Sequence, residues 1–310
     1  MNEASKPGGP RFGIVIVNWK QPSVTLRCLA SLATSTYLNR RIVVVDNGSK
    51  DGSAQIIKQA YPDLDLIISP ENLGFTGGNN LGIKYLHNPD IDYFLLLNND
   101  AVVESTTLVD LANAALNYPD AGFLGPKILL LEEPDVFLSA GGFILNGYLA
   151  VHRGIGEHDQ GQYNQPAPTD FLSGCALLVK RQAIDRIGLL DDEFFLYYEE
   201  VEWCQRAHIA GFPVLFVPSA RVWHPDTRSR DNESAQVTYY QTRNSLLFAR
   251  KTARGRPIIA RMLFEYYRRL LSWSIRPKWR DKKFQRRALR QALSDYAHGR
   301  YGKWNYCTWA

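Results

Sequence analysis

Short apolar runs alternate with amphipathic stretches along the first third of the chain. The predicted helices in this region begin after Pro22, at Asp51 or Ser53, and within the glycines of "GGNNLGIKYLH". Continuous apolar strands that alternate with amphipathic helices indicate an α/β fold, with a mostly parallel sheet covered by helices on both faces. The predicted buried strands are 12–19, 41–49, 64–69 and 93–100.

The second half of the chain continues this pattern with one long interruption. We expect a helix over 105–118, a strand over 175–180 with a helix that ends at Gly188, and an acidic helix that ends at Gly211. One or two strands are expected within "PVLFVPSARVWH". The segment 132–170 is rich in glycine and poorly periodic, which is typical of a lid or a binding loop.

Polar side chains stand at the ends of three predicted strands. In sheets of this kind, ligands bind at the carboxyl ends of the strands. Three neighbouring strands that direct amides and carboxylates into one crevice therefore predict a ligand site. The residues are Asn18, Asp46, Asn47, Asn98, Asn99 and Asp100.

The sequence "NND" at 98–100 has the chemistry of a cation site. The Asp100 carboxylate is an oxygen ligand of the kind that Mg²⁺ prefers, and Asn98 faces the same side of an extended chain. His224, after a later strand, could add an imidazole nitrogen. From these residues alone, an asparagine turn and an ordinary packed histidine remain alternatives.

Two further motifs suggest a ligand-binding or a catalytic role. Glycines in "ENLGFTGGNNLG" (71–82) allow the backbone to approach an anionic ligand closely at a helix N-terminus, although a tight strand–helix connection explains them equally well. Glu199, Glu200 and Glu202 begin a helix among aromatic residues. Burial there would raise the pKa of a carboxyl, as a general base requires, whereas helix capping is the alternative.

Charge is distributed unevenly along the chain. The net charge is +5, and from Arg250 onward the only acids are Glu265, Asp281 and Asp295. This asymmetry predicts an anionic partner surface. Residues 257–275 form an amphipathic helix that suits an anionic membrane interface, or packs on the core or on another subunit. Its apolar face is predicted to hold Ile259, Met262, Leu263, Tyr266, Leu270 and Trp273.

Other features restrict the cellular compartment. No apolar run is long enough for a membrane span, the N-terminus lacks a signal-peptide pattern, and the four cysteines show no paired spacing. We therefore expect a cytoplasmic protein, with peripheral attachment to the inner face of the cell membrane as an alternative.

The ordered blocks "GIVIVNW", "VVVDNGSKDGS", "NLGFTGGNNLGI", "LLLNNDAVV", "LSGCALLVKR", "FFLYYEEVEWCQRA" and "VWHP" resemble the inverting family-2 glycosyltransferases of the GT-A fold. The nearest branch is the bacterial rhamnosyltransferase-like and galactofuranosyltransferase-like enzymes. The resemblance covers 11–225, and the predicted domains are a disordered tail (1–10), a GT-A domain (11–245) and a basic helical extension (246–310).

The resemblance implies roles for individual residues. Glu200 corresponds to the general base, with Glu199 and Glu202 as alternates, and Asp100 and His224, with Asn98 as a further candidate, would hold Mg²⁺ or Mn²⁺. Ser173, Gly174 and Cys175 would line the acceptor side. The residues expected to bind the nucleotide sugar are Val17, Asn18, Asp46, Asn47, Asn72, Gly74, Phe75, Gly78, Asn79, Asn98, Asn99 and Asp100.

The implied activity is transfer of a rhamnose-like or other hexose in the synthesis of cell-surface polysaccharide. The donor would be a dTDP- or UDP-sugar, and the acceptor a hydroxyl of a glycan or a lipid-linked molecule. A non-catalytic nucleotide-sugar- or carbohydrate-binding subunit is the alternative. A nucleic-acid partner is not expected, because it would leave the polar strand ends unexplained, and assembly into a homo-oligomer stays open.

Overall fold

The computed structural model describes residues 9–226, 234–252 and 256–305. Most of the predicted disordered tail, residues 1–8, lies outside these ranges. The helices are α1 (Pro22–Ala33), α2 (Ser53–Ala60), α3 (Gly74–Leu86), α4 (Thr107–Asn117), α5 (Arg181–Ile187), α6 (Glu199–Ile209), α8 (Ala235–Lys251), α9 (Arg256–Ile275), α10 (Lys283–Ala297) and the 3₁₀ turn η1 (Pro277–Trp279). The strands are β1 (Phe12–Asn18), β2 (Arg40–Asp46), β3 (Asp65–Ile68), β4 (Tyr93–Asn98), β5 (Val102–Val103), β6 (Phe123–Leu130), β7 (Phe137–Ser139), β8 (Gly142–Leu145), β9 (Leu149–His152), β10 (Ala167–Pro168), β11 (Ala176–Lys180) and β12 (Val214–His224).

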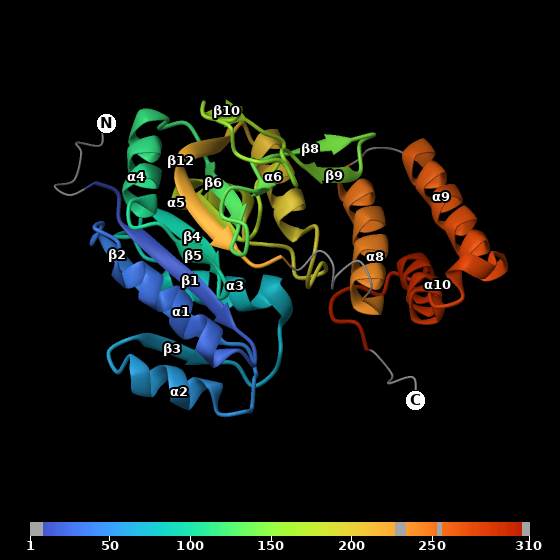
Figure 1. Cartoon of the computed structure of the whole chain (residues 1–310), viewed down its shortest axis with the longest axis horizontal. Coiled ribbons are helices and arrows are strands. Elements are labelled where there is room, and N and C mark those ends of the chain that lie inside the picture. The colour runs from blue at the N-terminus through green and yellow to red at the C-terminus, as the bar shows by residue number, and fades with distance from the viewer. Residues whose placement is uncertain (1–8, 227–233, 253–255, 306–310) are drawn as a thin grey trace.

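One large sheet organises the molecule (Figure 1). Its main path within the described residues runs β10-β12-β6-β11-β4-β1-β2-β3, with β5 and β7 attached at the side. Strands β1 to β4 are parallel, whereas β11 runs antiparallel between β4 and β6. The predicted mostly parallel α/β sheet is confirmed, and β4, β1 and β2 are direct neighbours, as the strand-end argument requires.

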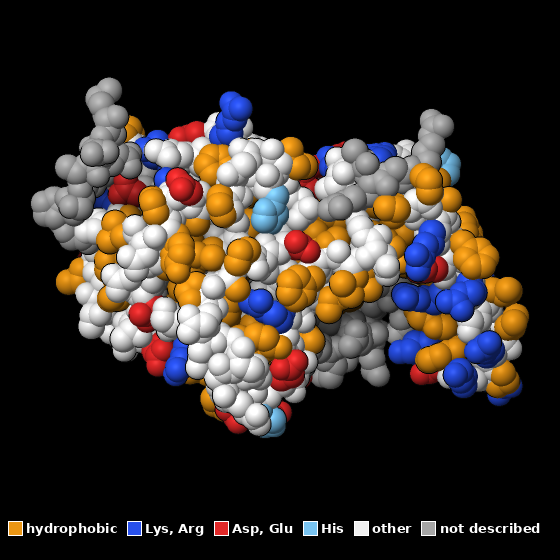
Figure 2. Space-filling model, turned by 90° about the horizontal axis from the view of Figure 1, so that it is seen from above, with side chains coloured by type: hydrophobic (Ala, Val, Ile, Leu, Met, Phe, Trp, Pro, Cys, Tyr) orange, Lys and Arg blue, Asp and Glu red, His pale blue; other side chains and the backbone are white. Residues whose placement is uncertain are grey.

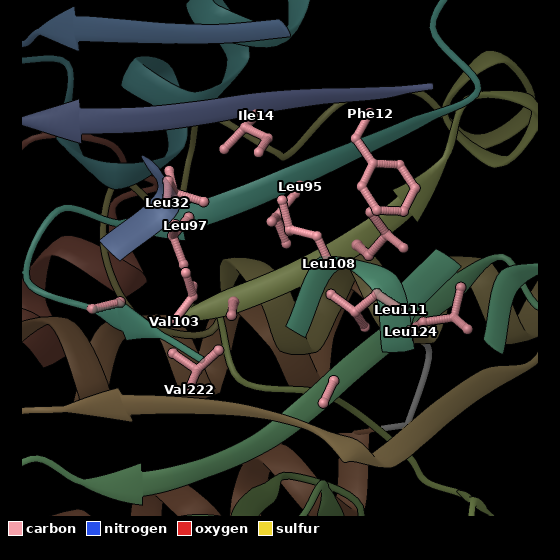
Figure 3. Packing of buried hydrophobic residues seen from close by; sticks show 14 of the residues in the cluster. Phe12, Ile14, Leu32, Leu95, Leu97, Val103, Leu108, Leu111, Leu124 and Val222 are labelled. Atoms are coloured by element: carbon pink, nitrogen blue, oxygen red, sulfur yellow. The ribbon is translucent and has the colours of Figure 1, made fainter. Parts of the chain in front are cut away.

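Alternate residues of each strand face two separate cores, as the pleat of a strand dictates. On one face, Ile14 and Leu95 pack with apolar residues of α1 and α4 (Figure 3). An apolar residue of α2 belongs to the same cluster. On the other face, Val15 and Phe94 pack with α3, α5 and α6. Burial on both faces explains why these strands are continuously apolar in the sequence.

The three C-terminal helices pack on one end of the sheet domain (Figure 1). Helix α8 crosses the predicted boundary at residue 245: Leu247 and Phe248 belong to the core that contains α6, whereas Leu246 packs with α9 and α10. The predicted apolar face of α9 also packs in this second cluster, through Met262 and its helical neighbours. Helix α8 therefore joins the sheet domain to the C-terminal helices.

Several elements were absent from the sequence prediction. Strand β6 is buried along its whole length, but its Gly125-Pro126 pair interrupts the β pattern. The irregular segment 132–170 contains the short strands β7 to β10, of which β8 and β9 form a hairpin. Helix α8 was also not predicted, and α10 lies within the predicted helical extension, for which no separate helix bounds were given. No helix in the described part of the chain combines the length and apolarity needed to cross a bilayer.

Candidate functional site

The ends of β1, β2 and β4 carry a connected hydrogen-bond network. Register places Asn18 beside Asp46 and Val17 beside Asn98. The Asn18 amide donates to Asp46 Oδ1 at 2.8 Å, and its own oxygen accepts from Thr25 Oγ1 at 2.8 Å. Buried polar groups that satisfy one another in this way hold a fixed geometry. The Asp46 carboxylate is therefore oriented before any ligand arrives.

Two members of this network were not among the predicted site residues. Thr25, in the first turn of α1, bridges Asn18 to Asn99, whose amide donates to Thr25 Oγ1 at 3.1 Å. Ser49 donates its hydroxyl to Asp46 Oδ1 and accepts the backbone N–H of Lys20 at 2.9 Å. Ser49 follows the polar strand end Asp46 by three residues and Thr25 follows Asn18 by seven, and this nearness in sequence was the available signal.

The glycine block closes over these strand ends. Asn47 donates to the Gly74 carbonyl at 2.9 Å and accepts from the Leu73 backbone N–H at 2.9 Å, and Asn72 accepts from the Gly74 N–H at 2.8 Å. A Cβ at Gly78 would lie 2.8 Å from a Val17 methyl carbon. Glycine therefore lets α3 approach the strand ends more closely than any other residue would allow.

The same arrangement brings the donor-side and acceptor-side predictions together. A Cβ added at Gly174 would lie 3.2 Å from the Phe75 ring and 3.8 Å from Glu200 Cβ. The backbone N–H of Asn98 donates to the Cys175 carbonyl at 2.9 Å. Residues from four separate blocks of the sequence thus meet at one place, where Asn79 also donates to the Phe75 carbonyl at 2.9 Å.

The three carboxyls of α6 lie in different environments. Burial raises the pKa of Glu200 to about 7, although backbone N–H groups at the start of the helix oppose the shift. Burial, together with the charge of Glu200, raises the pKa of Glu199 well above its usual range. Glu202 is paired with the Arg206 guanidinium at 2.8 Å. Glu200 is the carboxyl of the three whose Cβ lies beside Gly174.

The backbone before Glu200 is strained. Phe195, Tyr197 and Tyr198 have φ of 65°, 67° and 74°, in the left-handed region that residues with a Cβ rarely adopt. Each costs on the order of 1–3 kcal/mol and persists only where the surroundings enforce it. A conformation of this kind immediately before a buried carboxyl is typical of functional sites.

Asp100 and His224 form a close pair at the tip of β4. Asp100 Oδ1 lies 3.0 Å from His224 Nε2, and this buried oxygen is otherwise without a hydrogen-bond donor in the described part of the chain. His224 Nδ1 lies 2.9 Å from the Pro225 carbonyl, so Nδ1 carries a proton and Nε2 faces Asp100. The Asn98 amide also approaches Nε2, at 3.2 Å.

The electrostatics of His224 follow from this contact. Burial by itself would lower the pKa of His224, but the Asp100 carboxylate more than offsets that effect, and the net pKa is raised. Asp100 Oδ1 and His224 Nε2 nevertheless lie only 3.0 Å apart, with the carboxylate oxygen buried. One carboxylate oxygen and one imidazole nitrogen this close together form a donor set that fits a divalent metal ion.

Comparison with known proteins places the whole arrangement in one family. The chain matches the model described as glycosyltransferase like family 2 over residues 10–244. N-acetylglucosaminyl-diphospho-decaprenol L-rhamnosyltransferase of Mycobacterium tuberculosis is 28% identical over 284 residues, which cover 85% of this chain and 88% of the relative. Low-salt glycan biosynthesis hexosyltransferase Agl10 of Haloferax volcanii is 30% identical over 241 residues, covering 76% and 74%.

Solved structures give the same result for the fold. GalNAc-T7 with UDP, GalNAc and Mn²⁺ superposes with a TM-score of 0.61 at 14% identity, covering 94% of this chain and 57% of that one. At this identity the likeness concerns the fold alone, and it confirms the predicted GT-A architecture. The chain belongs to glycosyltransferase family 2, is a member of its rhamnosyltransferase-like branch, and is therefore a glycosyltransferase.

Proposed function

We propose that this glycosyltransferase moves L-rhamnose or another hexose from a dTDP- or UDP-sugar to a hydroxyl of a lipid-linked or glycan acceptor, in cell-surface polysaccharide synthesis. The convergence of Glu200, Gly174 and Phe75 at the ends of the strands carries this proposal. The name of the mycobacterial relative, an L-rhamnosyltransferase with a lipid-diphosphate-linked sugar as acceptor, supports the choice of substrates.

Glu200 is proposed as the general base. A carboxyl with a pKa of about 7 is largely ionised just above neutral pH and is still basic enough to take a proton from a sugar hydroxyl. As that proton passes to Glu200, the acceptor oxygen bonds to the anomeric carbon while the bond from this carbon to the diphosphate oxygen breaks. Attack from the face opposite the leaving diphosphate inverts the anomeric configuration.

The polar strand ends are proposed to hold the donor. Asp46 and Asn18 would bind the nucleotide base, since their side chains are already fixed by hydrogen bonds to each other and to Ser49. The backbone from Gly74 to Asn79 would lie against the nucleotide and sugar. Ser173, Gly174 and Cys175 would contact the acceptor, because the middle residue of the three, Gly174, lies between Phe75 of the glycine block and Glu200.

Asp100 and His224 are proposed as the protein ligands of Mg²⁺ or Mn²⁺, with Asn98 as a neighbouring amide. Their donor set of one carboxylate oxygen and one imidazole nitrogen suits such ions, which usually complete their coordination with water and substrate phosphates. When bound, the ion would neutralise the charge that develops on the leaving diphosphate. The structural neighbour crystallised with UDP and Mn²⁺ supports this proposal.

The outward face of α9 is proposed to contact an anionic membrane surface at the cytoplasmic side. Phe264, Tyr267, Leu271 and Ile275 form an exposed stripe at helical spacing, opposite the face that packs on α8. Figure 2 shows Lys and Arg side chains interspersed with hydrophobic ones at this end of the molecule. An apolar stripe among cations matches anionic headgroups above an acyl layer, where a lipid-linked acceptor would be found.

The donor site is tested by calorimetry with UDP, dTDP and GDP, each with and without Mn²⁺. We expect one pyrimidine diphosphate to bind in the presence of the metal and to bind at least tenfold more weakly to Asp100→Ala. Weaker binding follows because removal of a metal ligand or its support typically costs about 10–100-fold in affinity. Equal, metal-independent binding to both proteins would exclude the proposed metal site.

A further inference from the structure

The loop 193–198, which precedes α6, contacts the glycine block on the proposed donor side of the site. The Phe195 carbonyl accepts the backbone N–H of Thr76 at 3.3 Å. A Cβ at Gly74 would lie 2.4 Å from that same carbonyl oxygen. The loop therefore lies against the glycine block on one side, and it leads directly into Glu199 and Glu200. Its conformation determines where the first turn of α6 points relative to the donor.

On the opposite side, the loop is held by the Asn244 side chain of α8. Asn244 Nδ2 lies 2.9, 2.8 and 2.8 Å from the carbonyl oxygens of Phe194, Leu196 and Tyr197. Asn244 has no solvent-exposed area. The two N–H groups of one amide thus face three carbonyls, with at least one N–H shared, and a change in φ at Phe195 or Tyr197 would rotate carbonyls away from it.

Arg243, the preceding residue, extends this contact. Its guanidinium donates to the carbonyls of Phe194 and Glu193 at 3.2 and 3.3 Å, and to the Gly302 carbonyl at 2.8 Å. Its Nε donates to Asn244 Oδ1 at 2.9 Å, which orients the amide so that Nδ2 faces the loop. Arg243 has no solvent-exposed area either. A fully buried cation that binds backbone carbonyls holds the loop in one arrangement.

Lys251, near the end of the same helix, adds a third contact to the start of the loop. Its ammonium group forms ion pairs with Asp191 and Glu193 and is partly exposed to solvent. One face of α8 therefore binds the loop at both ends. None of these three residues lies in the blocks that bind the donor or the acceptor.

We propose that Asn244 and Arg243, with a smaller part for Lys251, are positioning residues for the general base, holding the loop 193–198 in its left-handed conformation so that the Glu200 carboxyl faces the acceptor hydroxyl. The proposal rests on the role given to Glu200 above. It assigns to α8 a part in catalysis, at a distance from the reacting atoms, through the backbone that precedes α6.

The test compares Asn244→Asp with wild type and with Gln241→Ala, which removes an exposed amide from the same helix. An ionised aspartate has the shape of asparagine but cannot donate to the three carbonyls. We expect kcat to fall about 10–100-fold, because small misplacements of a catalytic group have effects of that size. Affinity for the nucleoside diphosphate should change less than about threefold. Gln241→Ala should behave like wild type.

Two readouts separate positioning from general destabilisation. Backbone amides of 194–198 should exchange with D₂O faster in Asn244→Asp, while those of β1 and β4 stay protected. The midpoint of the pH–kcat profile should move to lower pH, because a loosened loop admits water to the Glu200 carboxyl. If wild type transfers sugar while Asn244→Asp keeps its kcat, its pH midpoint and its exchange pattern, the positioning proposal is wrong.

A milder variant covers the case in which Asn244→Asp does not fold. Lys251→Gln removes only the partly exposed ion pairs and leaves the buried amide in place. It should shift exchange at 191–196 and kcat in the same direction by a smaller factor, and unchanged values would contradict the proposal. Hydrogen exchange does not depend on activity. A wild type that transfers no sugar therefore counts against the proposed function and leaves the exchange result to decide the role of the loop contacts.

Discussion

At the scale of single residues, environment rather than residue type selects the proposed base. Glu199, Glu200 and Glu202 are identical in chemistry and almost adjacent in sequence. Burial raises the pKa of all three carboxyls, but Glu202 forms an ion pair with Arg206 that opposes the shift, and Glu199 lies deeper, beside the charge of Glu200. Glu200 combines a raised pKa with a position beside Gly174. The residue types name three candidates and the family resemblance favours Glu200, while the packing gives the physical difference between them.

Replacement of Glu200 by Gln removes the proton acceptor while it keeps the size of the side chain. We expect kcat to fall by about 10²–10⁴-fold, the usual contribution of a general base, with donor affinity nearly unchanged. Transfer assays with the donor found by calorimetry measure the first quantity. Glu202→Gln serves as the comparison and should retain most of the activity. Equal losses in both variants would contradict the assignment of the base to Glu200.

The pH dependence of the wild type follows from the raised pKa of Glu200. The ionised form is the active base, so kcat should rise with pH through a midpoint near 7 and reach a plateau above it. Glu199, Tyr198 and Cys204 face the same region and interact with the charge of Glu200. A midpoint near the usual 4.5 of a glutamate would show that burial does not control this group.

The same pKa shift has a consequence for stability. The folded-state pKa of Glu200 lies above the usual 4.5, so ionisation opposes folding as the pH rises from about 4.5 through 7. Glu200→Gln should therefore unfold at a higher temperature than wild type at pH 8 and at a similar temperature at pH 4.5. Thermal unfolding followed by circular dichroism at the two pH values measures this difference, and an equal shift at both would exclude a charge effect.

At the scale of elements, the site is built from strand ends and from the glycine block that closes over them. The sheet register sets Asn18, Asp46 and Asn98 side by side, because parallel strands end at the same edge. Helix α3 can approach that edge because Gly78 and Gly74 leave room for Val17 and Phe195. Close backbone contact, rather than any single polar side chain, gives this part of the site its shape.

Gly74→Ala and Gly52→Ala distinguish two physical reasons for a glycine, namely a positive φ and a close contact that leaves no room for a Cβ. Both residues have positive φ, 73° and 88°, but a Cβ at Gly52 would meet nothing within 4 Å, whereas one at Gly74 would meet Phe195. We expect Gly52→Ala to lower the free energy of unfolding by about 1 kcal/mol. Gly74→Ala should cost about 1–3 kcal/mol more, because the loop must move. Urea unfolding compares them, and equal costs would show that the contact with Phe195 is unimportant.

At the scale of the whole molecule, the C-terminal helices have two different faces. The face of α9 predicted from the sequence to be apolar packs on α8 and α10, and the hydroxyls of Tyr266 and Ser245 share a hydrogen bond of 2.7 Å. The exposed stripe lies on the other side, and Phe264 and Leu271 are 68% and 60% exposed. Truncation near residue 250 would uncover Leu246 and Ala249, so point substitutions test membrane binding more cleanly than truncation does.

The double variant Phe264→Ser, Leu271→Ser removes half of this stripe without touching the packed face. We expect it to bind phosphatidylglycerol vesicles at least tenfold more weakly than wild type in co-sedimentation, because each large apolar side chain contributes about 1.5–3 kcal/mol when buried. Leu38→Ser, at another exposed apolar position, is the control and should not change binding. Binding that is insensitive to the double variant, or equal on phosphatidylcholine, would contradict the proposed surface.

The sequence by itself determined the strands β1 to β4 and the polar residues at their ends. Runs such as "RIVVVD" have one stable environment, a strand buried on both faces, and the polar residue that follows each run must lie at the sheet edge. Strand β6 was not predicted because Gly125-Pro126 interrupts the local strand pattern. The strand forms nevertheless because it pairs with β12, which is distant in the sequence. Local propensity is weaker than such tertiary contacts.

Tertiary structure alone decided how distant segments meet. The close approach of Gly174 to Phe75 and Glu200, the Asp100–His224 pair and the hydrogen bonds from Asn244 to the loop before α6 each join residues far apart in the chain. No periodicity or spacing encodes such a distance, because it depends on the packing of the whole sheet and of α8 against it. The chemistry of the residues was readable from the sequence, whereas their geometry became available only in the folded chain.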